Sequence, residues 1–337
     1  MASTVLSDLD FNSNHYTNIM AGAFTNRRAL LMSGILKEIP DTILNRDIKG
    51  YFAHIPHYST LSGSSVQITT SLSSTINNLA SYDNVAAWIE REKAWGADQM
   101  NVVAAGADPA EEIMRQIGEY WANELVRVAI QNLGGAFTTA LLSLSTGATY
   151  AGSNITLPGG VAAKQLLGDN QDALQAVVMN SKVKSDALLA KILTELANTQ
   201  GAVDGYTSGS IEMFLGSRVY ASDQLSATAS VYPTYFGAEG AVGFKFRNRN
   251  SSSQTNSNVS IINAGGLNIE VEKARVSTTA GGQDLLISRA SFFAHPMGTA
   301  WTTATENPTD AQLATDSNWT KTATDDKLIK ITQLLTL

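Results

Sequence analysis

Two histidines three residues apart, His54 and His57, come nearest in this sequence to the type and spacing of a metal site. Zinc sites in proteins use such imidazoles, but they need three or four ligands. On a strand, residues three apart point to opposite faces, so one shared ion would require a bend at Pro56. The carboxylate nearest to these histidines along the chain, Asp47, lies on the other side of Gly50. We therefore expect two partly exposed imidazoles and no metal site.

Two further groups of residues suggest a binding site by their types. Trp88 and Trp95 stand close to Glu90 and Glu92, and aromatic rings beside carboxylates occur in sugar-binding sites. At this spacing we instead expect a helix that packs its aromatic residues into a core. The glycine-rich segment Gly237–Gly243 has no lysine and no capped helix after it, so it predicts a turn and not a phosphate cradle.

The acidic pairs and the missing motifs complete the search for chemistry. Glu111-Glu112 suits a helix N-terminus, and Asp325-Asp326 is expected to be solvated. The sequence has no serine elbow, no nucleotide-binding glycine loop and no zinc-protease motif, and it has no cysteine. We predict no catalytic, cofactor-binding or metal-binding residues, and thus a protein that is not an enzyme.

Composition limits the partners. The net charge is −7, and the dense basic spots are Arg27-Arg28 and Arg247 with Arg249, too few to track a nucleic acid backbone. The polar, acidic segment Met1–Asp10 does not resemble a signal peptide, and the apolar run Phe137–Leu144 is too short to span a membrane. We expect the sequons at Asn154 and Asn258 to be unused and the protein to fold in a cytoplasm.

The segment from Gly50 to Tyr82 contains no Asp, Glu, Lys or Arg, and half of Ser59–Ala80 is Ser or Thr. Val66, Ile68 and Thr70 alternate with polar residues, which is typical of strands. We predict a long β-ribbon. A two-stranded ribbon is marginal alone in water, and its edge invites pairing with another chain.

A long amphipathic helix is predicted from Pro109 to Leu133. Asp108, Pro109 and Glu111 form a start signal, and Gly134-Gly135 is a plausible stop. At 1.5 Å per residue the helix is roughly 37 Å long and lies along the body of the protein. Its apolar stripe consists of Met114, Ile117, Trp121, Leu125 and Val128.

The remaining segments predict shorter elements. Residues 1–25 show no period and are expected to order only against a partner. A helix with Leu30, Leu31 and Ile35 on one face is expected over Asn26–Ile39, before Pro40. Ser145–Gly160, ending in Leu157-Pro-Gly-Gly160, is a candidate boundary. Further predictions are a strand at Ala176–Met179, a helix capped by Asn180-Ser181 and bearing Leu188, Ile192 and Leu196, strands within Val231–Phe246, a polar loop at Asn248–Asn258, a hairpin of Leu267–Val271 with Asp284–Ala294, and a last strand at Leu328–Leu335.

The order of these features resembles the major capsid proteins of tailed bacteriophages, a fold shared with encapsulin shell proteins. The local likeness lies in the second half of the chain. It consists of Ala176–Val183, Val219–Asp223, Tyr235–Gly243, Glu270–Lys273, Asp284–Arg289, Phe293–Gly298 and Asn307–Leu313 with Asn318-Trp319.

The resemblance implies an α+β chain with an N-terminal arm, an extended loop (the E-loop), a spine helix, a peripheral domain and an axial domain. The arm would be 1–25, a short helix and connection 26–46, and the E-loop 47–80. The peripheral domain would combine 81–159 and 265–300, with the spine helix at 109–133. The axial domain would combine 160–264 and 301–337. Some members crosslink Lys to Asn, but Lys49 has no supporting constellation here.

The function implied is structural: self-assembly as pentamers and hexamers into an icosahedral shell that encloses the phage genome without sequence-specific contacts. Expected partners are other copies of the chain, with portal, scaffolding or decoration proteins as further candidates, and the expected location is the virion capsid after assembly in the bacterial host cytoplasm. The main alternative is an encapsulin-like compartment that packages a cargo enzyme. A third alternative is an enzyme with an unfamiliar site around His54 and His57. Metal bound to the purified protein would favour this alternative.

Overall fold

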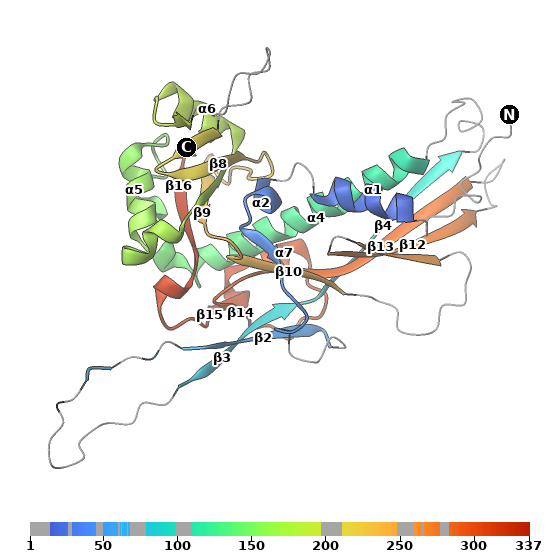
Figure 1. Ribbon diagram of the computed structural model, residues 1–337, viewed down its shortest axis with the longest axis horizontal. Helices are drawn as coiled ribbons and strands as arrows, with labels where there is room; N and C mark the ends of the chain where they lie inside the picture. The colour runs from blue at the N-terminus through green and yellow to red at the C-terminus, as the bar shows by residue number, and fades with distance from the viewer. Residues whose placement is uncertain are drawn as a thin grey trace.

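The computed structural model describes residues 14–25, 29–44, 50–59, 61, 63–65, 67, 79–98, 110–196, 211–247, 259–264, 266–276 and 283–337. One six-stranded sheet lies along a long helix, and a second six-stranded sheet lies beyond one end of that helix (Figure 1). Two further sheets have two strands each, and one of them is a ribbon that leaves the body. The helices are α1 (Asn14–Thr25), α2 (Ala29–Met32), α4 (Ala110–Thr138), α5 (Leu157–Gln165), α6 (Ser181–Leu189) and α7 (Asp310–Leu313). The strands are β1 (Leu36–Glu38), β2 (Phe52–Tyr58), β3 (Ser81–Ala87), β4 (Ile89–Asp98), β5 (Ala176–Met179), β6 (Thr194–Leu196), β7 (Ile211–Phe214), β8 (Ser217–Ala221), β9 (Tyr232–Gly237), β10 (Val242–Arg247), β11 (Val259–Ala264), β12 (Leu267–Val276), β13 (Gln283–Pro296), β14 (Thr299–Trp301), β15 (Trp319–Lys321) and β16 (Ile331–Thr336).

The long helix α4 confirms the strongest prediction from the sequence. The five residues of the predicted stripe are all buried, because the 3.6-residue period brings them to one side of the helix, and α4 packs against both α1 and β13. Trp121 lies in the middle of the contact with β13, and its indole N–H donates a hydrogen bond of 2.6 Å to the hydroxyl of Ser288. Asp108 and Pro109 of the predicted start signal lie outside the described residues.

The predicted stop of this helix at Gly134-Gly135 is wrong, since α4 continues to Thr138. A β-carbon placed on Gly135 would come within 2.6 Å of the indole nitrogen of Trp319, and closer still to the carbonyl oxygen of Leu313. The glycine therefore lets the C-terminal segment approach the helix backbone and does not end the helix.

The first sheet is built around β13, the longest strand. Its order is β1-β10-β13-β12-β11. Strand β4 also pairs with β13, along Gln283–Phe292, on the edge opposite β12. The predicted hairpin of Leu267–Val271 with Asp284–Ala294 is confirmed as β12 and β13, and Leu267, Ile269 and Val271 are buried as their alternation indicated. Strands β10 and β11, from the segment expected in the axial domain, pair within this sheet.

The helix expected around Trp88 and Trp95 is wrong. Ile89–Asp98 forms strand β4, which pairs antiparallel with β13 from Ile89↔Phe292 to Asp98↔Gln283. The rings nevertheless pack as expected of core residues: Trp95 makes an edge contact with Tyr120 of α4, and Trp88 makes one with Phe293. Pairing with the central strand outweighs the local spacing that indicated a helix.

Two predictions for the first 40 residues also need correction. Residues 14–25, expected to stay without structure until a partner binds, form α1, which buries Met20, Ala23 and Phe24 and packs along α4. Of the helix expected over Asn26–Ile39, the described part is helical only at Ala29–Met32. Gly34 then takes a positive φ of 73°, and β1 pairs in parallel with β10. This strand pairing takes the place of the remaining turns of the expected helix.

The second sheet has the order β16-β9-β5-β8-β7-β6. The predicted strands Ala176–Met179 and Val231–Phe246 are confirmed, and the last strand begins at Ile331. Asn180 caps α6 as predicted by accepting a 2.8 Å hydrogen bond from the backbone N–H of Lys182. Val183 and Ala187 form the buried face of α6, whereas Leu188 is exposed and Ile192 and Leu196 lie beyond the helix. Leu157-Pro-Gly-Gly160, expected as a boundary, is the first turn of α5, capped by Thr156.

His295 on β13 is fully buried beside Trp319, with its Nε2 2.8 Å from the carbonyl oxygen of Thr299. Burial lowers the pKa of His295 from 6.5 to about 4, with the hydrogen bond to Thr299 opposing the shift. Below pH 6.5 the unfolded chain therefore binds a proton that the folded chain accepts only near pH 4.

We expect the free energy of unfolding to fall by about 3 kcal/mol from this group as the pH drops from 7 to 4. His295→Gln should remove that part of the pH dependence, while His54→Gln, which changes an exposed ring, should not. Denaturant titrations of unassembled protein at several pH values measure the difference. If the free energy of unfolding depended on pH equally in the native protein and in His295→Gln, the lowered pKa could not be assigned to His295.

Candidate assembly surface

The ribbon of β2 and β3 forms a sheet of its own. Its register runs from Phe52↔Ala87 to Tyr58↔Ser81, and within the described residues neither strand pairs with a third. The return strand thus extends past residue 80, the predicted end of the loop, while the alternation at Val66, Ile68 and Thr70 lies outside the described residues. Pro56 in mid-strand lacks a backbone donor, so the outer edge of β2 is weakened at that position.

The ribbon exposes large apolar and aromatic side chains: Tyr51 lies at its base, and Tyr58, Leu61 and Leu79 lie further out. The exposed fractions are 50% for Tyr51, 68% for Tyr58, 79% for Leu61 and 53% for Leu79. An isolated two-stranded ribbon with no third strand is marginal in water. These side chains and free edges provide a surface that another protein chain can cover.

The inner part of the ribbon is fixed to the body by a small apolar cluster separate from the main core. The cluster comprises Ile39, Leu44, Ala53, Ile55, Ala86, Trp88 and Phe293. A hydrogen bond of 2.7 Å from the hydroxyl of Thr322 to Asn84 adds a polar tie to the C-terminal segment. The ribbon is therefore held at its base by this cluster and by the hydrogen bond between Thr322 and Asn84, and it extends away from the body (Figure 1).

The two histidines of the ribbon lie on opposite faces of β2, as strand geometry predicts, and His57 is partly buried. His54 is exposed, and its Nδ1 lies 3.8 Å from a carboxylate oxygen of Asp83 across the ribbon. His57 stacks on Tyr82, and burial lowers its pKa although Asp83 opposes the shift. Within the described ranges, no three potential metal-binding side chains gather in one place.

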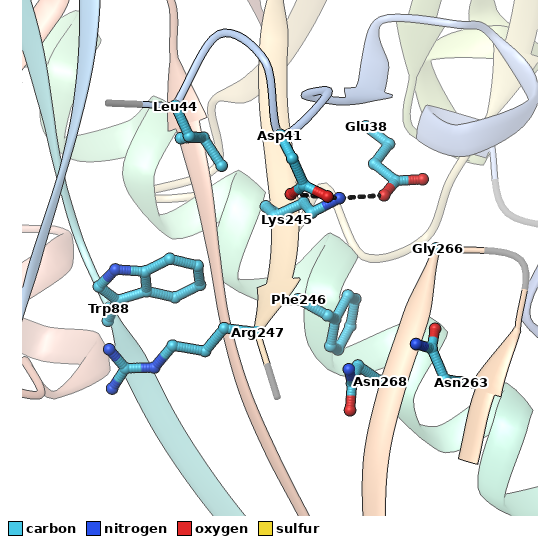
Figure 2. Close-up of a pocket in the computed structure, with 10 residues that line it drawn as sticks. All are labelled: Glu38, Asp41, Leu44, Trp88, Lys245, Phe246, Arg247, Asn263, Gly266 and Asn268. Atoms are coloured by element: carbon cyan, nitrogen blue, oxygen red, sulfur yellow. Dashed lines mark hydrogen bonds and ion pairs between the residues drawn. The ribbon is translucent and has the colours of Figure 1, made fainter. Parts of the chain in front are cut away.

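A polar pocket of about 300 Å³ lies beside the base of the ribbon (Figure 2). Lys245 of β10 bridges Glu38 at 2.7 Å and Asp41 at 3.1 Å on one side of it. Two residues further along the same strand, Arg247 extends towards Trp88. Lys245 thus ties β10 to the chain just before the ribbon, and Arg247 ties it to the ribbon itself.

The same face of the first sheet carries a cluster around Arg289 of β13. Its guanidinium pairs with Glu270 and Glu272 of β12 and with Glu92 of β4, and these carboxylates raise its pKa against the opposing effect of burial. Glu92, considered from the sequence as part of a sugar site, is thus part of an ion network across three strands. The arrangement stabilises the sheet by joining its three strands.

The other sequence candidates also have structural roles. Hydrogen bonds from Arg115 lower the pKa of Glu112 to about 2, and Asp326 pairs with Lys321. In the predicted turn between β9 and β10, β-carbons added to Gly237 and Gly243 would collide with Ile35 and Ile39, so these glycines allow the β1 segment to pack.

Arg247 is the residue that sequence reasoning undervalued. The sequence placed it in a basic spot with Arg249, whereas the structure buries most of its side chain among four segments. No local pattern marks an arginine as buried in this way, because its partners are distant along the chain.

Comparisons with known proteins give a consistent picture. The sequence is 25% identical to the major capsid protein of Bacillus phage SPP1 over 99% of this chain and 98% of the relative. A chain of the cyanophage A-1(L) capsid superposes with a TM-score of 0.52 and 11% identity, covering 80% of this chain and 88% of that one. A chain of the cyanophage Pam1 capsid superposes with a TM-score of 0.51 and 11% identity, covering 89% of this chain and 94% of that one. No family model matches the sequence. The described helices and strands thus have the fold of phage capsid proteins, and the predicted fold class is confirmed.

Proposed function

We propose that this chain is the major capsid protein of a tailed bacteriophage, a structural subunit whose copies form the shell around the genome. The observation that carries the proposal is the likeness to a phage major capsid protein along nearly the full length of both chains. The fold and the unpartnered ribbon agree with it.

In this proposal the peripheral domain is built around α4, β12 and β13, and the axial domain around the second sheet with α5 and α6. Strands β10 and β11, which the sequence assigned to the axial domain, are reassigned to the peripheral domain because they pair within the first sheet. Pentamers and hexamers form around the axial domains, and each ribbon lies across a neighbouring subunit. The arm comprises residues 1–25, although α1 within it already packs on its own α4. Portal, scaffolding and decoration proteins are further proposed partners, and assembly takes place in the host cytoplasm.

The mechanism is cooperative weak association. One ribbon contact of about 4–8 kcal/mol corresponds alone to only millimolar to micromolar binding. Closure of the shell makes each further contact effectively intramolecular, so many weak contacts give one stable particle. The net charge of −7 is compatible with DNA that is confined by the wall and not bound to it.

Expression of the chain alone tests the proposal. We expect negative-stain electron microscopy to show closed shells or rings of five and six subunits, and sedimentation to show material far larger than a 35.9 kDa monomer. A compact monomer at every protein concentration, with the ribbon folded on its own body, would contradict it.

A further inference from the structure

Both ends of the ribbon meet at one guanidinium group, that of Arg247. On the entering side, Nη1 donates a 2.7 Å hydrogen bond to the carbonyl oxygen of Gly50, two residues before β2. On the leaving side, the guanidinium carbon lies 4.8 Å from the centre of the Trp88 ring, directly after β3. The backbone N–H of Trp88 also donates to the carbonyl of Tyr51, so the two ends are joined to each other.

The other contacts of Arg247 fix the guanidinium to the first sheet. Nε donates a 2.7 Å hydrogen bond to the hydroxyl of Ser291 on β13, and Nη2 pairs with Glu90 of β4 at 2.9 Å. The side chain is only 11% exposed, so water screens these contacts weakly. A planar guanidinium can make several directed contacts at once, which a lysine ammonium on a flexible stem cannot reproduce.

Apolar packing holds the ribbon base through a few side chains at its inner end. Ala53, Ile55 and Ala86 enter the small cluster, and Phe52 and Ala87 pack on the main core. Trp88 also belongs to this cluster, but it borders the open pocket, and its indole nitrogen is buried without a hydrogen-bond partner among the described residues (Figure 2). The position of Trp88 therefore depends on Phe293 on one side and Arg247 on the other.

We propose that Arg247 is the positioning residue that fixes the direction in which the ribbon leaves the body, and thereby the ability of the subunit to join a shell. The consequence for assembly rests on the proposed function, while the effect on the ribbon does not. A ribbon that swings about Gly50 and Trp88 presents its exposed side chains in many directions, and a neighbour can bind only the fraction that points correctly.

The test compares Arg247→Ala and Arg247→Lys with Lys245→Ala. Lys245 lies on the same strand and at the same pocket, but its two ion pairs go to Glu38 and Asp41, which precede the ribbon in the chain. The first readout is chymotrypsin cleavage after Tyr51 and Tyr58 in unassembled protein, mapped by mass spectrometry. The second is thermal unfolding, and the third is the yield of shells by sedimentation.

We expect Arg247→Ala to raise the cleavage rate by at least about tenfold, because cleavage follows the population of the opened ribbon. The shell yield should fall in parallel, Arg247→Lys should be intermediate, and Lys245→Ala should cleave and assemble like the native protein. Equal cleavage in Arg247→Ala and Lys245→Ala would overturn the proposal, as would normal shells from Arg247→Ala. If Arg247→Ala does not fold, the comparison of Arg247→Lys with Lys245→Ala decides in the same way. If the native protein forms no shells, the proposed function fails, but the cleavage comparison still tests the role of Arg247.

Discussion

Replacing residues 59–80 by a two-residue Asn-Gly turn should abolish shell formation and leave a folded, soluble subunit. Tyr58 and Ser81 are opposite each other in the ribbon register, so a short hairpin turn can join them without disturbing β2 or β3. The change removes the uncharged, Ser- and Thr-rich part of the ribbon together with Leu61 and Leu79. Each subunit then loses one of the contacts that closure multiplies, and the loss repeats at every position in the shell.

Negative-stain microscopy and sedimentation measure the outcome, and far-ultraviolet circular dichroism with thermal unfolding checks that the shortened subunit is folded. A second variant, with a Gly-Ser linker of the original length in place of residues 59–80, separates the effect of the segment's sequence from the effect of its length. It should also fail to assemble. Normal shells from either variant would show that the ribbon is not an assembly contact.

Trp121→Ala should produce the largest loss of stability from a single substitution in the body. The indole is fully buried between α4 and the first sheet, contacts Phe292 edge-on and bonds to Ser288. Truncating a buried tryptophan costs about 3–5 kcal/mol, and the stranded hydroxyl of Ser288 adds about 1 kcal/mol or more. Because domains are stable by only about 5–15 kcal/mol, the variant should be close to unfolded at physiological temperature.

The free energy of unfolding should be measured in the subunit that lacks residues 59–80, because assembly would add to the apparent stability. Trp95→Ala is the matched control, since Trp95 is only partly buried and contacts α4 through Tyr120. We expect it to cost about 1–2 kcal/mol less than Trp121→Ala. Equal losses would mean that the contact between α4 and β13 is not centred on Trp121.

The sequence predicted those elements whose burial follows a local period. The stripe of α4 and the alternation of Leu267, Ile269 and Val271 both arise because one face of the element meets the core and the other does not. The cap at Asn180 was predictable for a similar reason, since the partner of the side chain is two residues away.

The sequence could not predict elements that depend on distant partners. Leu36–Glu38 becomes a strand because β10, about two hundred residues later, offers an edge, and Ile89–Asp98 becomes one because β13 does. Gly135 resembles a helix stop until the approach of Trp319 is known. The anchoring of the ribbon by Arg247 belongs to the same class, because Gly50, Trp88 and Ser291 are far from it along the chain.

The position of β13 has a mechanical consequence for a subunit under tension. This strand is paired with β12 and β4 along its first part and with β10 along its last part, and α4 packs along it. Hydrogen bonds between antiparallel strands run perpendicular to the strand axis. Tension applied along β13 therefore strains many of these bonds together in shear and does not open them one at a time, so the subunit is stiffest in the direction of its longest strand.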